Sequence, residues 1–199
     1  MRWFGTEDYR LRKMARLCAG RRRVLDLGPM EMPNRHLQNA EVIGLDMEPG
    51  RLPANYSACT VGDVMELPAP FEPGSFDAIH AGEILEHVEA PVEFLRRCLR
   101  TLAPGGVLVL STPNPHSPYE LLLTVTLCRR FMYDKNRYRP KLDHVCLYPQ
   151  RWLIRIMEMA GFVDVRLYSG GIFVPLFGQV PFPRPWCYQT IAAARRSTE

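Results

Sequence analysis

The chain has 199 residues, which is enough for one domain with a complete hydrophobic core and too few for two ordinary ones. Hydrophobic residues make up 47% and charged residues 23%, a composition that excludes disordered and collagen-like proteins. The net charge is only +4, the charged N-terminus lacks the apolar run of a secretory signal, and no apolar run is long enough to cross a bilayer. A cytoplasmic protein with reduced cysteines is therefore expected.

Short apolar runs alternate with segments of helical periodicity in the first half of the chain. Residues 1–22 contain one amphipathic helix, "YRLRKMARLC". Residues 23–28 and 41–46 are expected to form buried strands, followed by further strands at 57–63 and 74–82. This alternation is typical of a parallel sheet that is covered on both faces.

The second half of the chain continues the same pattern. An amphipathic helix is expected at 91–102, stopped by the turn "APGG", and a strand at 107–114. A helix at 148–162 precedes two apolar segments, 163–170 and 186–196, which are expected to close the sheet as an antiparallel pair. No linker separates these elements, so one domain over residues 1–199 is predicted.

The ends of the expected strands carry a series of motifs: "VLDLG", "VIGLD", "GDV", "FDAI" and "LAPGGVLVLSTPN". In this order they resemble the class I S-adenosylmethionine-dependent methyltransferases, and the similarity extends over about residues 23–170. The resemblance implies a Rossmann-like, doubly wound α/β domain whose seven-stranded, mostly parallel sheet has an antiparallel last strand. It also implies S-adenosylmethionine at the carboxyl ends of the strands and a segment at 113–150 that covers the acceptor.

Candidate cofactor residues lie at these strand ends, where open α/β sheets bind their ligands. Asp46 is placed to accept hydrogen bonds from the two ribose hydroxyls, and Asp63 matches the family position that meets the adenine edge. Both are also common turn residues. The cofactor-binding residues that the resemblance implies are Asp26, Gly28, Pro29, Asp46, Met47, Gly62, Asp63, Val64 and Ala81.

The first loop departs from the family pattern D-x-G-x-G-x-G, whose glycines let the backbone approach the cofactor. Here the loop reads "DLGPMEMPNRHL", so Met30 and Met32 stand where glycines are expected. The short connection leaves room only for a short helix from about Pro33, whose free N–H groups would face the cofactor carboxylate. A descendant that binds S-adenosylmethionine without transferring its methyl group stays open as an alternative.

The segment "GEILEHVEAP" places Glu83, Glu86 and His87 at helical spacings i, i+3 and i+4, so one shared helix face is expected. The pattern is similar to that of ubiquinone-biosynthesis O-methyltransferases and of small-RNA 2′-O-methyltransferases, in which a distant histidine completes a divalent-metal site. The matching set here would be Glu83, Glu86, His87 and His144. Such ligands suit Mn²⁺, Fe²⁺, Co²⁺ or Zn²⁺ better than Mg²⁺. Without a metal, His87 or His144 would be the catalytic base.

The sequence leaves the acceptor open. A hydroxyl on a small molecule, a glycan or a lipid-linked intermediate is the first hypothesis, with the apolar segment 170–186 either walling the acceptor pocket or merely joining the last two strands. The second is an RNA ribose, because residues 128–141 interleave six basic side chains with three aromatic ones. The oligomeric state and the methylated atom are not predicted.

Overall fold

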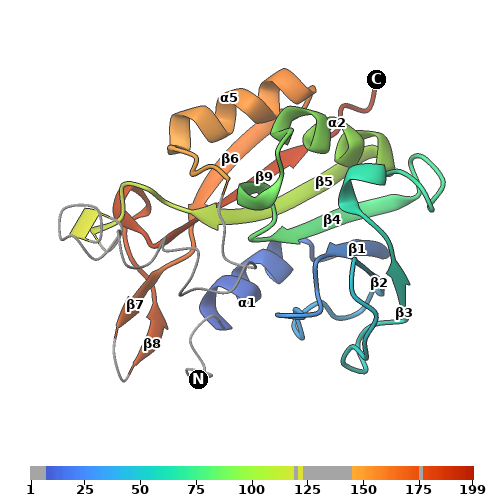
Figure 1. The fold of residues 1–199 in the computed structure, drawn as a ribbon, viewed down its shortest axis with the longest axis horizontal. Coiled ribbons are helices and arrows are strands. Elements are labelled where there is room, and N and C mark those ends of the chain that lie inside the picture. The colour runs from blue at the N-terminus through green and yellow to red at the C-terminus, as the bar shows by residue number, and fades with distance from the viewer. Residues whose placement is uncertain (1–7, 119–120, 123–144, 175–176) are drawn as a thin grey trace.

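The protein forms one seven-stranded sheet in the computed structural model, which describes residues 8–118, 121–122, 145–174 and 177–199 (Figure 1). The strands are β1 (Arg23–Leu27), β2 (Glu41–Asp46), β3 (Ala58–Val61), β4 (Phe76–Gly82), β5 (Leu102–Pro113), β6 (Val163–Ser169) and β9 (Gln189–Arg195). Their order is β3-β2-β1-β4-β5-β9-β6, and β9 runs antiparallel to both of its neighbours. The predicted doubly wound, mostly parallel fold with an antiparallel last strand is confirmed.

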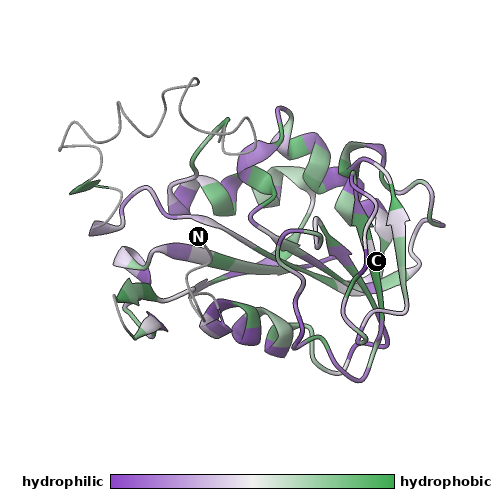
Figure 2. Ribbon diagram, turned by 60° about the horizontal axis from the view of Figure 1, so that its bottom comes forward, coloured by the Kyte–Doolittle hydropathy of each residue, from purple (hydrophilic) through white to green (hydrophobic). Residues whose placement is uncertain are grey.

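The central strands consist of continuous apolar runs because both faces of the sheet are covered. Leu25 in β1, Ile79 in β4 and Leu108 in β5 are each 0% exposed. β3, at the edge of the sheet, is half exposed. In Figure 2 the central strands are mostly hydrophobic, whereas the helices carry both hydrophobic and hydrophilic residues.

Helices cover the two faces of the sheet (Figure 1). α2 (Pro91–Thr101) and α5 (Gln150–Ala160) pack against each other on one face, and α1 (Asp8–Leu17) packs on the other. α5 ends where Gly161 adopts φ 105°, a left-handed conformation that glycine tolerates without steric cost. Among the described residues, no helix combines the length and apolar character that a bilayer span requires.

The connection between β1 and β2 contains turns and no helix in the described chain, so the short helix predicted from about Pro33 is wrong. The polar groups of Asn34 instead form hydrogen bonds with residues of other elements and loops. Its side-chain nitrogen lies 3.0 Å from the carbonyl oxygen of Leu11 and 3.1 Å from Nε2 of His80, and its backbone nitrogen donates to the hydroxyl of Tyr56 at 2.8 Å. These bonds fix the connection without a helix.

A buried polar network lies beneath this connection. Asp26 in β1 is 1% exposed, and its carboxylate accepts hydrogen bonds from Nδ1 of His80, at 2.6 Å, and from the hydroxyl of Tyr56. Burial, and then the charge of Asp26, raise the pKa of Tyr56 above its ordinary value, so the phenol stays protonated and donates. The network joins β1, β4 and both loops that flank β2.

Two segments differ from the sequence-based expectation. β5 begins at Leu102 rather than at 107, and its pairing with β4 shifts register between Phe76 and Ala78. The apolar segment before β9 forms a hairpin, β7 (Ile172–Val174) with β8 (Gly178–Val180), followed by the 3₁₀ turn η4 (Arg184–Trp186). Residues 119–120 and 123–144 of the expected acceptor segment lie outside the described residues.

Candidate functional site

A cavity of about 510 Å³ opens at the carboxyl ends of β1, β2 and β4. This is the edge at which open parallel sheets bind ligands. Six of its lining residues were predicted from the sequence, namely Gly28, Asp46, Met47, Asp63, Val64 and His87. The residues that sequence reasoning missed are Leu45, Met65, Ile84, Val88, Glu89 and Ala90. They are mostly apolar, and no motif distinguishes them from core residues.

Gly28 is required by the geometry of the cavity floor. Its φ is +66°, and its backbone nitrogen donates to the carbonyl oxygen of Leu45 at 2.9 Å. A Cβ atom at this position would lie 2.4 Å from Cδ1 of Ile84, which also lines the cavity. Glycine at position 28 therefore permits the left-handed backbone conformation and leaves room for the side chain of Ile84.

Gly28→Ala is expected to weaken binding of S-adenosylmethionine about tenfold or more, because it strains the backbone and displaces Ile84 into the cavity. Gly20→Ala is the matched control: Gly20 has φ +78° but no atom within 4 Å of the added Cβ. Isothermal titration calorimetry compares the two variants. Equal, unchanged affinities would contradict the role given to Gly28.

Two aspartate carboxylates line the cavity, which is also lined by Glu89. Asp46 closes β2, and its side chain accepts hydrogen bonds from the backbone nitrogens of Met30, at 2.9 Å, and of Glu48, at 3.0 Å. Asp63 accepts from the backbone nitrogen of Met65 at 2.8 Å and so caps the 3₁₀ turn η1 (Val64–Glu66). Each carboxylate is held in position by the backbone and still has acceptor capacity toward the cavity.

The two methionines that replace glycines in the first loop do not line the cavity. The sulfur of Met30 lies 2.6 Å from the point where a Cβ of Gly50 would be. The sulfur of Met32 accepts a hydrogen bond from Nη2 of Arg10 at 3.1 Å. Both side chains are therefore directed to other parts of the fold, and the cavity is kept despite the glycine-poor loop.

Four predicted cofactor residues are not among the residues that line the cavity. Asp26 is engaged by His80 and Tyr56, and Ala81 is 1% exposed in the core. Pro29 is buried, and the backbone nitrogen of Gly62 donates to the carbonyl oxygen of Asp46 at 2.9 Å. In this arrangement these residues support the lining residues instead of facing the cavity.

The expectation that Glu83, Glu86 and His87 share one helix face is wrong. Glu83 follows β4 directly with φ +56°, and only the three-residue 3₁₀ turn η2 (Leu85–His87) comes after it. Because no continuous α-helix spans the three residues, the i, i+3, i+4 rule does not apply. Glu86 is 0% exposed, whereas His87 is exposed and lines the cavity.

Glu83 is bound by a residue that the sequence reasoning missed, Arg10 of α1. Nη1 of Arg10 lies 3.2 Å from Oε1 of Glu83 and 2.6 Å from Oγ of Ser111, whose hydroxyl donates to the same carboxylate oxygen at 2.8 Å. Arg10 is 2% exposed and lies on the buried side of α1 with Leu11 and Met14. A charged residue within an apolar helical stripe is the sequence signal that could have revealed it.

Glu86 is a buried acid. Neither carboxylate oxygen has a hydrogen-bond partner among the described residues. Burial, and then the neighbouring carboxylate of Glu83, raise the pKa of Glu86 well above its ordinary value. The hydroxyl of Thr112 acts in the opposite direction and lowers this pKa, but it makes no hydrogen bond of normal geometry with described atoms. Burial and the neighbouring carboxylate therefore favour the protonated form of Glu86 more than they would for an exposed glutamate.

Glu86→Gln is expected to stabilise the fold as pH rises above 4.5, the usual value for a glutamate. Between that value and its raised pKa, the folded chain binds the proton more tightly than the unfolded chain, so wild-type stability falls by up to about 1.4 kcal/mol per pH unit. The glutamine variant lacks this loss of stability. Urea unfolding from pH 4 to 8 measures the free energy of unfolding, and Glu89→Gln, at an exposed position, is the control. Parallel curves of stability against pH for Glu86→Gln and wild type would contradict the prediction.

The predicted metal ligands do not converge in the described part of the chain. No three side chains of the ligating types that the structure describes are grouped to hold an ion. The carboxylate of Glu83 is bound by Arg10 and Ser111, and His87 is directed to the cavity while Glu86 is buried. His144, the fourth predicted ligand and second candidate base, lies outside the described residues.

The family model described as "Methyltransferase domain" matches residues 8–167. A relative from Mycolicibacterium smegmatis, named "Probable S-adenosylmethionine-dependent methyltransferase", is 33% identical over 120 residues, which cover 56% of this chain and 46% of the relative. A ubiquinone biosynthesis O-methyltransferase of Xanthomonas oryzae is 38% identical over 112 residues, 50% of this chain and 46% of the relative. This chain thus spans about half the length of these relatives.

Solved structures have the same fold. A SAM-dependent methyltransferase from Thermotoga maritima superposes with a TM-score of 0.70 at 16% identity, covering 96% of this chain and 89% of that one. A SAM-dependent methyltransferase from Archaeoglobus fulgidus superposes with a TM-score of 0.65 at 20% identity, covering 94% of this chain and 92% of that one. Together with the strand order and the cavity, the family match means that the chain belongs to the class I S-adenosylmethionine-dependent methyltransferases.

Proposed function

We propose that the chain transfers a methyl group from S-adenosylmethionine to a hydroxyl oxygen of a small molecule, a glycan or a lipid-linked acceptor. The observation that carries the proposal is the composition of the cavity. Two aspartates, Asp46 and Asp63, lie at the ends of β2 and β3, and an imidazole, His87, lines the same cavity after β4. The matches to ubiquinone biosynthesis O-methyltransferases support oxygen as the acceptor atom.

The residues of the cavity fit a nucleoside with a sulfonium group. Asp46 would accept hydrogen bonds from the ribose hydroxyls, and Asp63 would meet the adenine edge. The backbone at Gly28 permits a close approach because it carries no side chain there. Ile84 and Val88 supply apolar surface that excludes water from the sulfonium.

S-adenosylmethionine, when bound, supplies a methyl group on sulfur: a C–O bond forms as the C–S bond breaks, and S-adenosylhomocysteine leaves. His87 accepts the proton of the acceptor hydroxyl, so the attacking oxygen gains nucleophilicity as the bond forms. The rest of the rate enhancement comes from alignment of the hydroxyl with the methyl group, which the cavity walls impose.

His87→Gln is the experiment that tests this proposal. The variant should lower kcat for methyl transfer about 100-fold or more while leaving the affinity for S-adenosylmethionine unchanged. The assay uses donor with a deuterated methyl group and a set of catechols, a prenylated catechol, a glycan and a short RNA as acceptors, with products identified by mass spectrometry. His36→Gln is the control, because His36 lies in the connection between β1 and β2, pairs with Asp8 of α1 and does not line the cavity. A product methylated on nitrogen or carbon, or an unchanged kcat, would refute the proposal.

The same assay separates the other hypotheses. An RNA ribose acceptor draws its support from the basic residues 128–141, which lie outside the described residues, and it would appear as a methylated RNA. A metal requirement involving His144 would appear as loss of activity with a chelator. Binding of the donor without transfer to any acceptor would identify a non-catalytic protein.

A cytoplasmic location is part of the proposal. It is supported by the five described cysteines, which are all free.

A further inference from the structure

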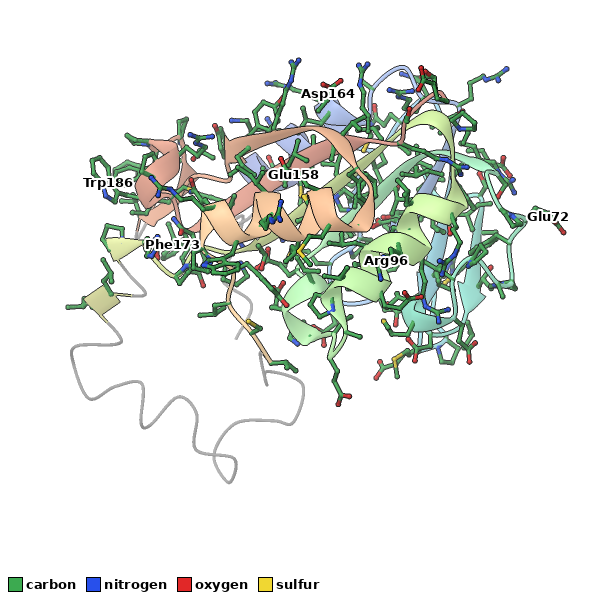
Figure 3. The ribbon with its side chains drawn as sticks, turned by 90° about the horizontal axis from the view of Figure 1, so that it is seen from above. Glu72, Arg96, Glu158, Asp164, Phe173 and Trp186 are labelled. Carbon is green, nitrogen blue, oxygen red and sulfur yellow. The ribbon has the colours of Figure 1, made fainter. Side chains whose placement is uncertain are left out.

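Three large aromatic side chains are exposed at one end of the molecule. Trp152 is 64% exposed, Trp186 56% and Phe177 79%. They come from the first turn of α5, from η4 and from the turn of the β7–β8 hairpin. In Figure 3, Trp186 of η4 and Phe173 of the hairpin lie at the end of the molecule opposite Glu72. We call Trp152, Trp186 and Phe177 the aromatic end.

Hydrogen bonds fix the elements that carry the aromatic end. The side-chain nitrogen of Gln150 in α5 donates to the carbonyl oxygen of Arg184 in η4 at 2.8 Å. The backbone nitrogen of Tyr188 donates to the carbonyl oxygen of Gly171, at the base of the hairpin, at 2.7 Å. The three aromatic residues are therefore presented by connected elements rather than by independent loops.

The aromatic end lies at the edge of the sheet that also holds the cavity. Asn114, which follows β5 directly and is 0% exposed, donates from its side chain to the carbonyl oxygens of Pro185, at 3.1 Å, and Cys187, at 2.9 Å. Because β5 is parallel to β4 and pairs with it, the carboxyl end of β5 adjoins that of β4. η4 is thus anchored at the edge of the sheet where β4 and β5 end.

Exposed arginines accompany the two tryptophans of the aromatic end. Arg151, Arg155 and Arg184 are exposed on α5 and η4. The first turn of α5 and the whole of η4, all within the described residues, contain no acidic side chain. Tryptophan at the level of lipid headgroups, with arginine beside lipid phosphates, is the composition of membrane-interface segments.

We propose that the aromatic end docks on a membrane surface that contains anionic lipids. Trp152, Trp186 and Phe177 would enter the headgroup region, and Arg151 and Arg184 would contact lipid phosphates. A membrane with anionic lipids is favoured over a protein partner because exposed tryptophans lie beside exposed arginines, and the first turn of α5 and the whole of η4 carry no acidic side chain. Docking of the aromatic end on a membrane does not depend on the reaction that the protein catalyses. The further step, in which the membrane delivers a lipid-linked acceptor to the cavity, rests on the proposed function.

The test is cosedimentation of the whole chain with phosphatidylcholine vesicles, with and without phosphatidylglycerol. The wild-type chain should bind the vesicles that contain phosphatidylglycerol, and binding should weaken with salt. Trp152→Ala combined with Trp186→Ala should lower the partition coefficient about tenfold or more, since two interfacial anchors are lost. Val163→Ala, 44% exposed at the start of β6, should leave it unchanged.

Charge is tested separately. Arg184→Gln should weaken binding to the anionic vesicles, whereas Arg96→Gln on α2, which is exposed away from the aromatic end, should not (Figure 3). The proposal is overturned if the wild-type chain binds neither vesicle or if the double tryptophan variant binds as well as Val163→Ala. It is also overturned if the tryptophans instead support a dimer in solution. Calorimetric titration of S-adenosylmethionine on the same samples distinguishes a failed docking surface from a failed cofactor site.

Discussion

Asp46→Ala is expected to weaken binding of S-adenosylhomocysteine about 100-fold. The carboxylate lies on the cavity wall at the end of β2, where it would accept both ribose hydroxyls. Each charge-assisted hydrogen bond contributes about 1.5–3 kcal/mol, so the loss of two costs about 3 kcal/mol or more. Isothermal titration calorimetry gives the dissociation constant directly.

Glu48→Ala is the matched control for Asp46. Glu48 is an exposed carboxylate two residues further along, and it is not among the described residues that line the cavity. Asp46 also accepts backbone hydrogen bonds from Met30 and Glu48, so the thermal unfolding of the alanine variant is recorded alongside. A folded Asp46→Ala variant that binds as tightly as Glu48→Ala would show that this carboxylate does not hold the ribose.

Arg10→Met is expected to lower the free energy of unfolding by about 2–4 kcal/mol. The substitution removes the cation that pairs with Glu83 and the hydrogen bond that Arg10 donates to the hydroxyl of Ser111. It leaves the Glu83 carboxylate beside the buried Glu86. Because the side chain of Glu83 is 25% exposed, the effect should lie below that of a fully buried broken pair. Urea unfolding followed by circular dichroism measures the loss.

Arg12→Met in the same helix provides the comparison. Arg12 pairs with Asp8 one turn earlier, but its side chain is 59% exposed, so its removal should cost no more than about 0.5 kcal/mol. Similar losses for the two variants would mean that Arg10 contributes only ordinary packing of α1. A larger loss for Arg10→Met that Glu83→Gln partly reverses would confirm the charge pairing.

The sheet was predictable because each strand is an apolar run whose burial is decided by its own composition. β1, β2, β4 and β9 lie where the sequence placed them, since their residues are buried on both faces. The helix expected after Pro33 failed for a non-local reason. Asn34 bonds to Leu11, Tyr56 and His80, which are up to 46 positions away in the chain.

The candidate site divides in the same way. Gly28, Asp46 and Asp63 end parallel strands, so topology alone brings them to one edge. Glu83 and Glu86 were misplaced because φ +56° at Glu83 breaks the helical register that their spacing assumes. Arg10 could not be assigned to this cluster from spacing, because 73 positions separate it from Glu83 and only the packing of α1 brings them together.

A crystal structure of the chain with S-adenosylhomocysteine tests most directly that the cavity at the ends of β1, β2 and β4 is the donor site. We expect the adenosine in this cavity, with both ribose hydroxyls within hydrogen-bond distance of the Asp46 carboxylate and the adenine beside Asp63. Density for the nucleoside elsewhere, for example in the cavity between α1 and residues 36–40, or an Asp46 that does not contact the ribose, would contradict it.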